Sequence, residues 1–132
     1  MEKELFTLSD FGQDANGKLN IIGTFDQVMV QELPATLPNC TLTARVRFEK
    51  REAGKHQLKI KCVDALGKEI FQTIEGNLEV NIPIDQNSLG VNLVINLNQI
   101  KVERAGEYYF ELYISNNRVG KLPIKVLRTV MA

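Results

Sequence analysis

The sequence predicts an all-β fold, an antiparallel β-sandwich, from three observations. Residues 106–114 read Gly-Glu-Tyr-Tyr-Phe-Glu-Leu-Tyr-Ile, in which core-type and surface-type side chains alternate. A strand points successive side chains to opposite faces, so this period of two indicates a strand with one buried face. The same alternation recurs along the chain with turn signals at intervals of roughly 8–12 residues, and no amphipathic helix is evident. We therefore expect about eight to ten short strands in a Greek-key, immunoglobulin-like arrangement, with an eight-stranded jelly roll as the alternative.

The first half of the chain contains a hairpin and a proline-rich crossing between sheets. Asn16-Gly17 tolerates positive φ at both positions, which favours a tight hairpin turn. Pro34 and Pro38 lack the backbone N–H that a strand donates to its neighbour, so residues 33–38 cannot be a central strand. The expected strands are 5–11, 18–25, 27–33, 40–48 and 56–63, with Ala53-Gly54 turning the chain between the last two.

The second half is expected to contain strands at 70–74, 78–84, 91–97, 106–114 and 119–127. Ala65-Leu-Gly-Lys68 and the polar loop 85–90 provide turns, and Ser115-Asn-Asn-Arg118 closes the final hairpin. Residues 98–105 have room for one helical turn at most.

Parity within the expected strands predicts which side chains are buried. Tyr108, Phe110, Leu112 and Ile114 are expected in the core, with Glu107, Glu111 and Tyr113 more exposed. Cys40 and Cys62 fall on inward positions, and we expect both to be buried free thiols because a reducing cytosol disfavours disulfides.

Length and composition are those of one soluble domain covering residues 1–132. Sixteen basic and sixteen acidic residues cancel, so net charge favours no polyanionic partner. The first ten residues lack the apolar core of a secretory signal, and no run approaches the ~20 apolar residues of a membrane helix. We therefore expect a cytoplasmic protein with no membrane span.

Two segments carry a resemblance. Ala105-Gly-Glu-Tyr108 resembles the approach to the F strand of immunoglobulin-like sandwiches, which implies that the Tyr108 hydroxyl returns to nearby backbone as a tyrosine corner. Phe6-Thr-Leu-Ser-Asp10, followed by Gly17-Lys-Leu-Asn-Ile-Ile-Gly-Thr-Phe-Asp26, Leu33-Pro-Ala35 and Ala53-Gly54, resembles a bacterial family of small all-β proteins known as a domain of unknown function. That resemblance would cover nearly the whole chain, and it implies a compact sandwich without an assigned activity or catalytic residues.

Charge is unevenly distributed along the chain. Arg45, Arg47, Lys59 and Lys61 occupy outward positions on what should be one hairpin, which predicts a basic patch on one face. Such a patch could bind nucleic acid, an anionic surface or an acidic protein. It lacks interleaved aromatic residues, and glutamates on neighbouring strands could neutralise it. We favour neutralisation by Glu75, Glu79, Glu107 or Glu111.

Tyr109 and Tyr113 point outward two positions apart. Exposed tyrosines can serve recognition, or they can pack against lysine and arginine stems of neighbouring strands. Asn92, Asn96 and Asn98 also point outward and suggest a solvated face.

No catalytic, cofactor or metal signature is present. His56 is the single histidine and is expected at a rim. One histidine and two separated cysteines do not form a usual zinc-ligand pattern. The aspartates near strand ends fit turn chemistry better than a calcium site; they are Asp10, Asp14, Asp26, Asp64 and Asp85.

We therefore expect a non-enzymatic module without a cofactor that binds a protein, itself or another, through an exposed sheet face or edge. Arg45, Arg47, Lys59, Lys61, Tyr109 and Tyr113 are the candidate binding residues. The alternative is a small-ligand binder or an enzyme that uses the loops at one pole of the sandwich.

Overall fold

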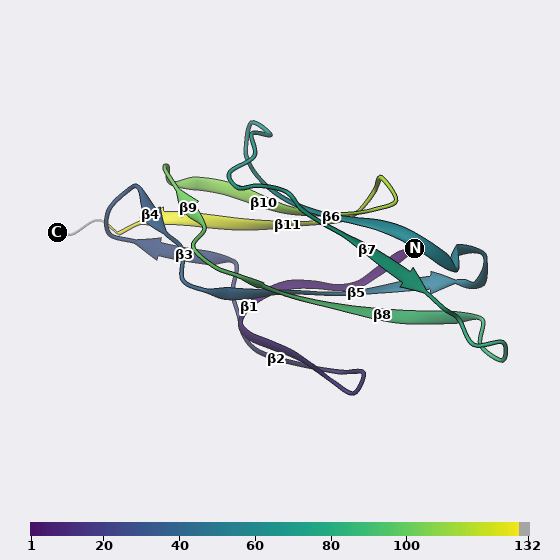
Figure 1. The fold of residues 1–132 in the computed structure, drawn as a ribbon. Helices are drawn as coiled ribbons and strands as arrows, with labels where there is room; N and C mark the ends of the chain where they lie inside the picture. The colour runs from purple at the N-terminus through teal and green to yellow at the C-terminus, as the bar shows by residue number, and fades with distance from the viewer. Residues whose placement is uncertain (130–132) are drawn as a thin grey trace.

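The computed structural model describes residues 1–129 and consists almost entirely of strands, which lie in two stacked layers (Figure 1). One layer, the first sheet, has the strand order β2-β1-β5-β8. The other, the second sheet, has the order β3-β11-β10-β6-β7. The strands of the first sheet are β1 (Glu2–Ala15), β2 (Lys18–Thr24), β5 (Cys40–Glu49) and β8 (Ser88–Leu97). Those of the second sheet are β3 (Gln27–Val30), β6 (Gly54–Asp64), β7 (Ile74–Val80), β10 (Gly106–Ile114) and β11 (Asn117–Arg128).

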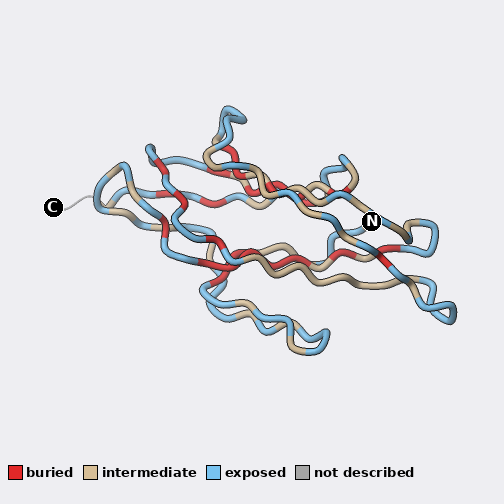
Figure 2. The backbone as a smooth tube through the Cα atoms, in the orientation of Figure 1, coloured by how far each residue is buried: buried red, intermediate tan, exposed pale blue. Residues whose placement is uncertain are grey.

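A single hydrophobic core fills the space between the two sheets, and both layers carry buried residues along their strands (Figure 2). Val46 and Phe48 of β5 and Phe110 of β10 have no solvent-accessible surface. The all-β prediction is therefore confirmed. The described residues hold eleven strands, slightly more than the eight to ten expected, because β4 (Ala35–Thr36) and β9 (Lys101–Val102) form a small sheet of their own.

Strand β10 follows the predicted parity with one exception. Tyr108, Phe110, Leu112 and Ile114 are buried, and Glu107 is exposed, as expected. Glu111 was expected to be exposed and is buried instead. Its carboxylate accepts a hydrogen bond from Arg118 Nη1 at 3.2 Å, so β11 covers it with a partner of opposite charge.

Two expectations about the middle of the chain are wrong. Residues 70–73 form no strand, although Glu69 makes an isolated bridge to Val63. The strand expected at 78–84 begins earlier, at Ile74, and ends at Val80, before Pro83. Strand propensity alone did not locate these bounds, because pairing with β6 decides them.

Strands β5 and β6 are not a hairpin, which is the largest correction. A short 3₁₀ turn, Lys50–Glu52, carries the chain from one sheet to the other. β5 pairs with β1 and β8, whereas β6 pairs with β10 and β7. Outward side chains on β5 and β6 consequently lie on opposite outer faces of the molecule.

The beginning of β10 carries the predicted tyrosine corner. The Tyr108 hydroxyl donates to the backbone oxygen of Arg104 at 2.6 Å. β3 pairs in parallel with β11. The second sheet is therefore mixed, whereas we expected purely antiparallel sheets.

The hairpin formed by β2 and the second half of β1 lies over the outer face of β5 and β8. β1 pairs with β5 up to Ser9 and with β2 from Ser9 onward, so its second half no longer pairs with β5. A Cβ added to Gly12 would lie 2.7 Å from the Thr43 hydroxyl, which shows how closely the hairpin backbone approaches β5. Thr41 and Thr43 are buried beneath it, although their parity points away from the core.

Both cysteines are buried free thiols, as predicted. Burial raises the pKa of each thiol, and for Cys62 burial together with the charge of Cys40 raises the pKa to about 12. Because the thiolate is the reactive form, these residues act as small core side chains.

Candidate interaction surfaces

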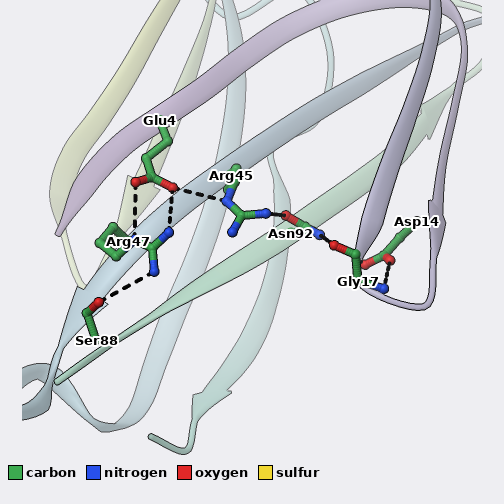
Figure 3. Close-up of polar contacts among 7 residues, drawn as sticks. All are labelled: Glu4, Asp14, Gly17, Arg45, Arg47, Ser88 and Asn92. Atoms are coloured by element: carbon green, nitrogen blue, oxygen red, sulfur yellow. Dashed lines mark hydrogen bonds and ion pairs between the residues drawn. The ribbon is translucent and has the colours of Figure 1, made fainter. Parts of the chain in front are cut away.

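On the outer face of the first sheet, Arg45 and Arg47 share one carboxylate (Figure 3). Glu4 accepts hydrogen bonds from Arg45 Nε at 3.0 Å and from Arg47 Nε and Nη2 at 3.1 Å each. A bulge in β1 between Lys3 and Leu5 includes Glu4 and places it over the two arginines. The hydrogen bond from Arg47 is the main cause that lowers the pKa of Glu4, so this carboxylate stays ionised at neutral pH.

The polar contacts continue from these arginines to the tip of the hairpin (Figure 3). Arg45 Nη1 donates to Asn92 Oδ1 at 3.4 Å, and Asn92 Nδ2 donates to the Gly17 carbonyl at 3.2 Å. Asp14 accepts from the Gly17 N–H at 2.8 Å, which is the turn chemistry expected of this aspartate. The network thus joins β1, β5, β8 and the hairpin into one polar surface.

Lys59 and Lys61 lie on the other outer face, on β6 of the second sheet. Lys59 Nζ is 3.8 Å from Glu75, and Lys61 Nζ is 3.8 Å from Glu69. The single basic patch predicted from the sequence is therefore wrong, because its two halves are separated by the thickness of the molecule. Each of its four cations has a carboxylate within ion-pair distance.

Tyr109 and Tyr113 are half-buried beside lysine side chains on the same face. Lys121 Nζ lies 4.3 Å from the ring centroid of Tyr109, and Lys61 Nζ lies 5.4 Å from that of Tyr113. The Tyr109 hydroxyl donates to Glu107 at 2.7 Å, which raises the pKa of the phenol. Both rings thus pack with cations of neighbouring strands, the structural alternative considered for them.

His56 lies at the pole where β6 begins and joins two turns. Its Nε2 lies 2.6 Å from the backbone oxygen of Glu52, which can only accept, so this nitrogen carries a proton. In the neutral ring Nδ1 then accepts from the Ser115 hydroxyl at 2.7 Å. The ring also packs on Phe48 at 5.4 Å. These contacts agree with the expected rim position.

A shallow groove of about 360 Å³ lies where the hairpin meets β3. It contributes one carboxylate, from Asp10, and is lined also by Gly23, Thr24, Phe25, Gln27, Val28, Met29 and Pro38. Within residues 1–129, no three histidine, cysteine or acidic side chains are grouped as metal ligands would be. In the same range, no helix has the length and apolarity needed to cross a membrane.

The sequence did not single out the free edge of β8 as a candidate site. All ten residues of β8 pair with β5, from Ser88 opposite Glu49 to Leu97 opposite Cys40. In the described part of the chain, no strand pairs with the other side of β8. An unpaired edge offers a row of N–H and C=O groups to another strand. Proteins usually block such edges with charges or proline, yet β8 reads Ser-Leu-Gly-Val-Asn-Leu-Val-Ile-Asn-Leu and has neither.

Two backbone hydrogen bonds identify the groups that face this free edge. The Asn87 backbone oxygen accepts from Lys50 N, so the backbone groups of Asn87, the odd-numbered residue just before β8, point toward β5. The Leu8 backbone oxygen accepts from Phe25 N, so the backbone groups of Leu8 point toward β2 and away from β5. The backbone groups of its partner Leu42 therefore point toward β8, where they meet those of Ile95. Backbone groups in an antiparallel strand alternate between its two sides. Consequently, those facing the free edge belong to Ser88, Gly90, Asn92, Val94 and Asn96.

Four of the five core-facing side chains of β8 are incompletely buried, and the fifth, Leu97, is buried. Leu89, Val91, Leu93 and Ile95 are all half-buried, whereas their pairing partners on β5 are fully buried. The paired side chains of β5 and β8 point to the same side of the same sheet, so their difference in burial comes from the missing strand beyond β8. A further strand there would remove this apolar surface from water.

The free edge of β7, which is seven residues long, differs from that of β8 in its charge. β7 alternates Glu75, Asn77 and Glu79, all exposed, with more buried residues. Charged side chains on an edge strand discourage pairing with another chain. These two edges thus differ in how well they are protected, and β8, with ten residues, is the longer and the less protected of the two.

Residues 4–127 match the model of a protein family described as a family of unknown function, DUF6941. No curated protein matches the chain.

Proposed function

The chain belongs to this family of unknown function, DUF6941, and we propose that it is a non-enzymatic interaction module that binds an extended polypeptide segment along β8. In this binding mode the peptide adds one strand to the first sheet. Main-chain hydrogen bonds then provide affinity, and alternate side chains provide specificity. The observation that carries the proposal is the ten-residue, uncharged free edge of β8.

The surface charges support a protein partner over a polyanion. Arg45, Arg47, Lys59 and Lys61 each have a glutamate partner, and they are divided between two faces. A nucleic-acid surface would instead gather unpaired cations on one face. The small-ligand alternative is less well supported, because the groove near β3 is shallow and contributes a single carboxylate.

The immunoglobulin-like architecture is part of this proposal. Constant-type immunoglobulin domains order their strands A-B-E-D in one sheet and C-F-G in the other. The neighbours β1-β5-β8 and β6-β10-β11 match A-B-E and C-F-G, and the tyrosine corner of Tyr108 supports the match. A strand beside E would occupy the place of D, which is the place we propose for the bound peptide. We further propose a cytoplasmic location, which the two free thiols support.

Selection from a displayed library of linear peptides tests the proposed function. Val94→Pro removes an N–H that faces the free edge and no bond to β5. Asn77→Pro is its matched control, because it removes an N–H that points to the free edge of β7. The Gln57 backbone oxygen accepts from Ser115 N on the β10 side, so the backbone groups of Gln57 point away from β7. Those of its partner Asn77 therefore point to the free edge.

We expect the peptides selected on the wild type to have apolar residues at every second position and to lack proline. They should bind the Asn77→Pro variant normally and lose binding to the Val94→Pro variant. The proposal fails if dilute, monomeric protein selects no peptide, or if the selected peptides bind both folded variants equally.

A further inference from the structure

We propose that the strand bound along β8 is the β8 of a second copy of this chain, paired antiparallel about a two-fold axis at Asn92. This inference rests on the proposed function, because it names the partner of the same edge. The resulting dimer would join two first sheets into one continuous sheet.

Charge is the first argument for a second copy. Any partner strand brings its own side chains next to those of β8, and like charges that face each other across two strands are destabilising. Residues 88–97 contain no Asp, Glu, Lys or Arg. The side chains of β8 itself therefore bring no like charges against each other when β8 pairs with a second β8. β7 could not pair with a second β7 as freely, because Glu75 and Glu79 of one copy would approach those of the other.

The direction of the backbone groups is the second argument, and it selects a register. Two antiparallel strands exchange hydrogen bonds between residues whose N–H and C=O groups face each other. The even-numbered residues of β8 face outward, as derived above. Aligning Asn92 with Asn92 of the second copy pairs Gly90 with Val94 and Ser88 with Asn96. All five outward-facing residues of each copy are then satisfied in an isologous contact.

The half-buried apolar side chains are the third argument. In the same register Val91 faces Leu93, and Leu89 faces Ile95, all on the core side of the sheet. These are the side chains whose partners on β5 are buried and which lack a neighbour beyond β8. Pairing with a second copy covers apolar surface with apolar surface along the strand.

Sedimentation velocity over a wide range of concentrations tests the inference. We expect the wild type to reach twice its chain mass of 14.9 kDa as concentration rises. The Val94→Pro variant should remain at the mass of one chain, whereas the Asn77→Pro variant should dimerise like the wild type. Circular dichroism establishes that each variant is folded.

A covalent trap decides the register and does not depend on the proline variant being folded. Residues in a hydrogen-bonded antiparallel pair have Cα atoms ~5.5 Å apart, which a disulfide can span. Mild oxidation of the Asn92→Cys variant should therefore produce a covalent dimer, and the Asn77→Cys variant should not. The native thiols do not interfere, because Cys40 and Cys62 are buried.

Three results would overturn the inference: a wild type that stays monomeric at all concentrations, a dimer that persists in a folded Val94→Pro variant, or no cross-link through Asn92→Cys. The proposed function fails separately. A monomeric wild type that still selects peptides sensitive to Val94→Pro refutes the self-pairing alone, whereas a monomer that selects none refutes both.

Discussion

β7 and β8 are both edge strands, and each pairs on one side with a strand of its own sheet. β7 carries two exposed glutamates in seven residues, whereas β8 has none in ten. A charged edge resists pairing with another chain, and an uncharged apolar edge permits it. Of these two edges, one is thus protected and the other remains available, and the difference is in side chains rather than in backbone.

The largest expected effect comes from moving a proline by one residue within β8. Ile95→Pro removes an N–H that bonds to β5 and should lower the free energy of unfolding by about 3 kcal/mol or more. Val94→Pro removes an outward N–H and should cost about 1 kcal/mol or less. Urea unfolding measures both. Equal losses would mean that the side of β8 facing solvent has been assigned wrongly.

The next effect compares the two valines that face each other across β5 and β8. Val46 is fully buried and its partner Val91 is half-buried. Val46→Ala should lower the free energy of unfolding by about 2 kcal/mol, through lost burial and a cavity, and Val91→Ala by about 1 kcal/mol. The measurement should be made on dilute, monomeric protein. A loss at Val91 as large as that at Val46 would show that the edge is already covered.

Removing the charges of β7 should make it behave like β8. In the Val94→Pro background, Glu75→Thr with Glu79→Thr replaces both exposed glutamates by residues that favour strands. The lost ion pair of Glu75 with Lys59 is exposed and should cost about 0–1 kcal/mol. Light scattering should detect new association. If the variant stays monomeric, charge does not explain the difference between the two edges.

The smallest effect concerns Glu4, whose arginine partners lie on β5. Because the folded pKa of Glu4 is lowered, its ionised form adds stability above the ordinary glutamate pKa. That contribution is lost as pH falls from the ordinary glutamate pKa through the lower folded value. Thermal unfolding should therefore show a deficit for Glu4→Gln at neutral pH that shrinks on acidification. A deficit independent of pH would contradict the assignment.

Alternation predicted the faces of strands well but not their neighbours. The parity of β10 apart from Glu111, the tyrosine corner and the buried thiols follow from short-range patterns, and they were predicted correctly. The partnership of β5 and β6 was predicted wrongly. Whether the connection at Lys50–Glu52 closes a hairpin or crosses to the other sheet depends on long-range pairing, which parity does not encode.

The candidate site was found only in part for the same reason. Arg45, Arg47, Lys59 and Lys61 were correctly predicted to point outward, but their division between two faces needed the topology. The ten uncharged residues of β8 are visible in the sequence, yet nothing local indicates that this strand is at an edge. That residues 1–132 form one domain, and that the chain is bacterial, remain predictions from length and resemblance.

Amide hydrogen exchange within β8, followed residue by residue by NMR, tests the central claim most directly. In dilute protein the amides of Val91, Leu93 and Ile95 should exchange slowly, because they bond to β5, while those of Gly90, Asn92 and Val94 exchange fast. Raising the protein concentration, or adding a peptide selected on the wild type, should slow the second group selectively. Fast exchange of Gly90, Asn92 and Val94 that neither treatment changes would contradict the claim that β8 accepts another strand.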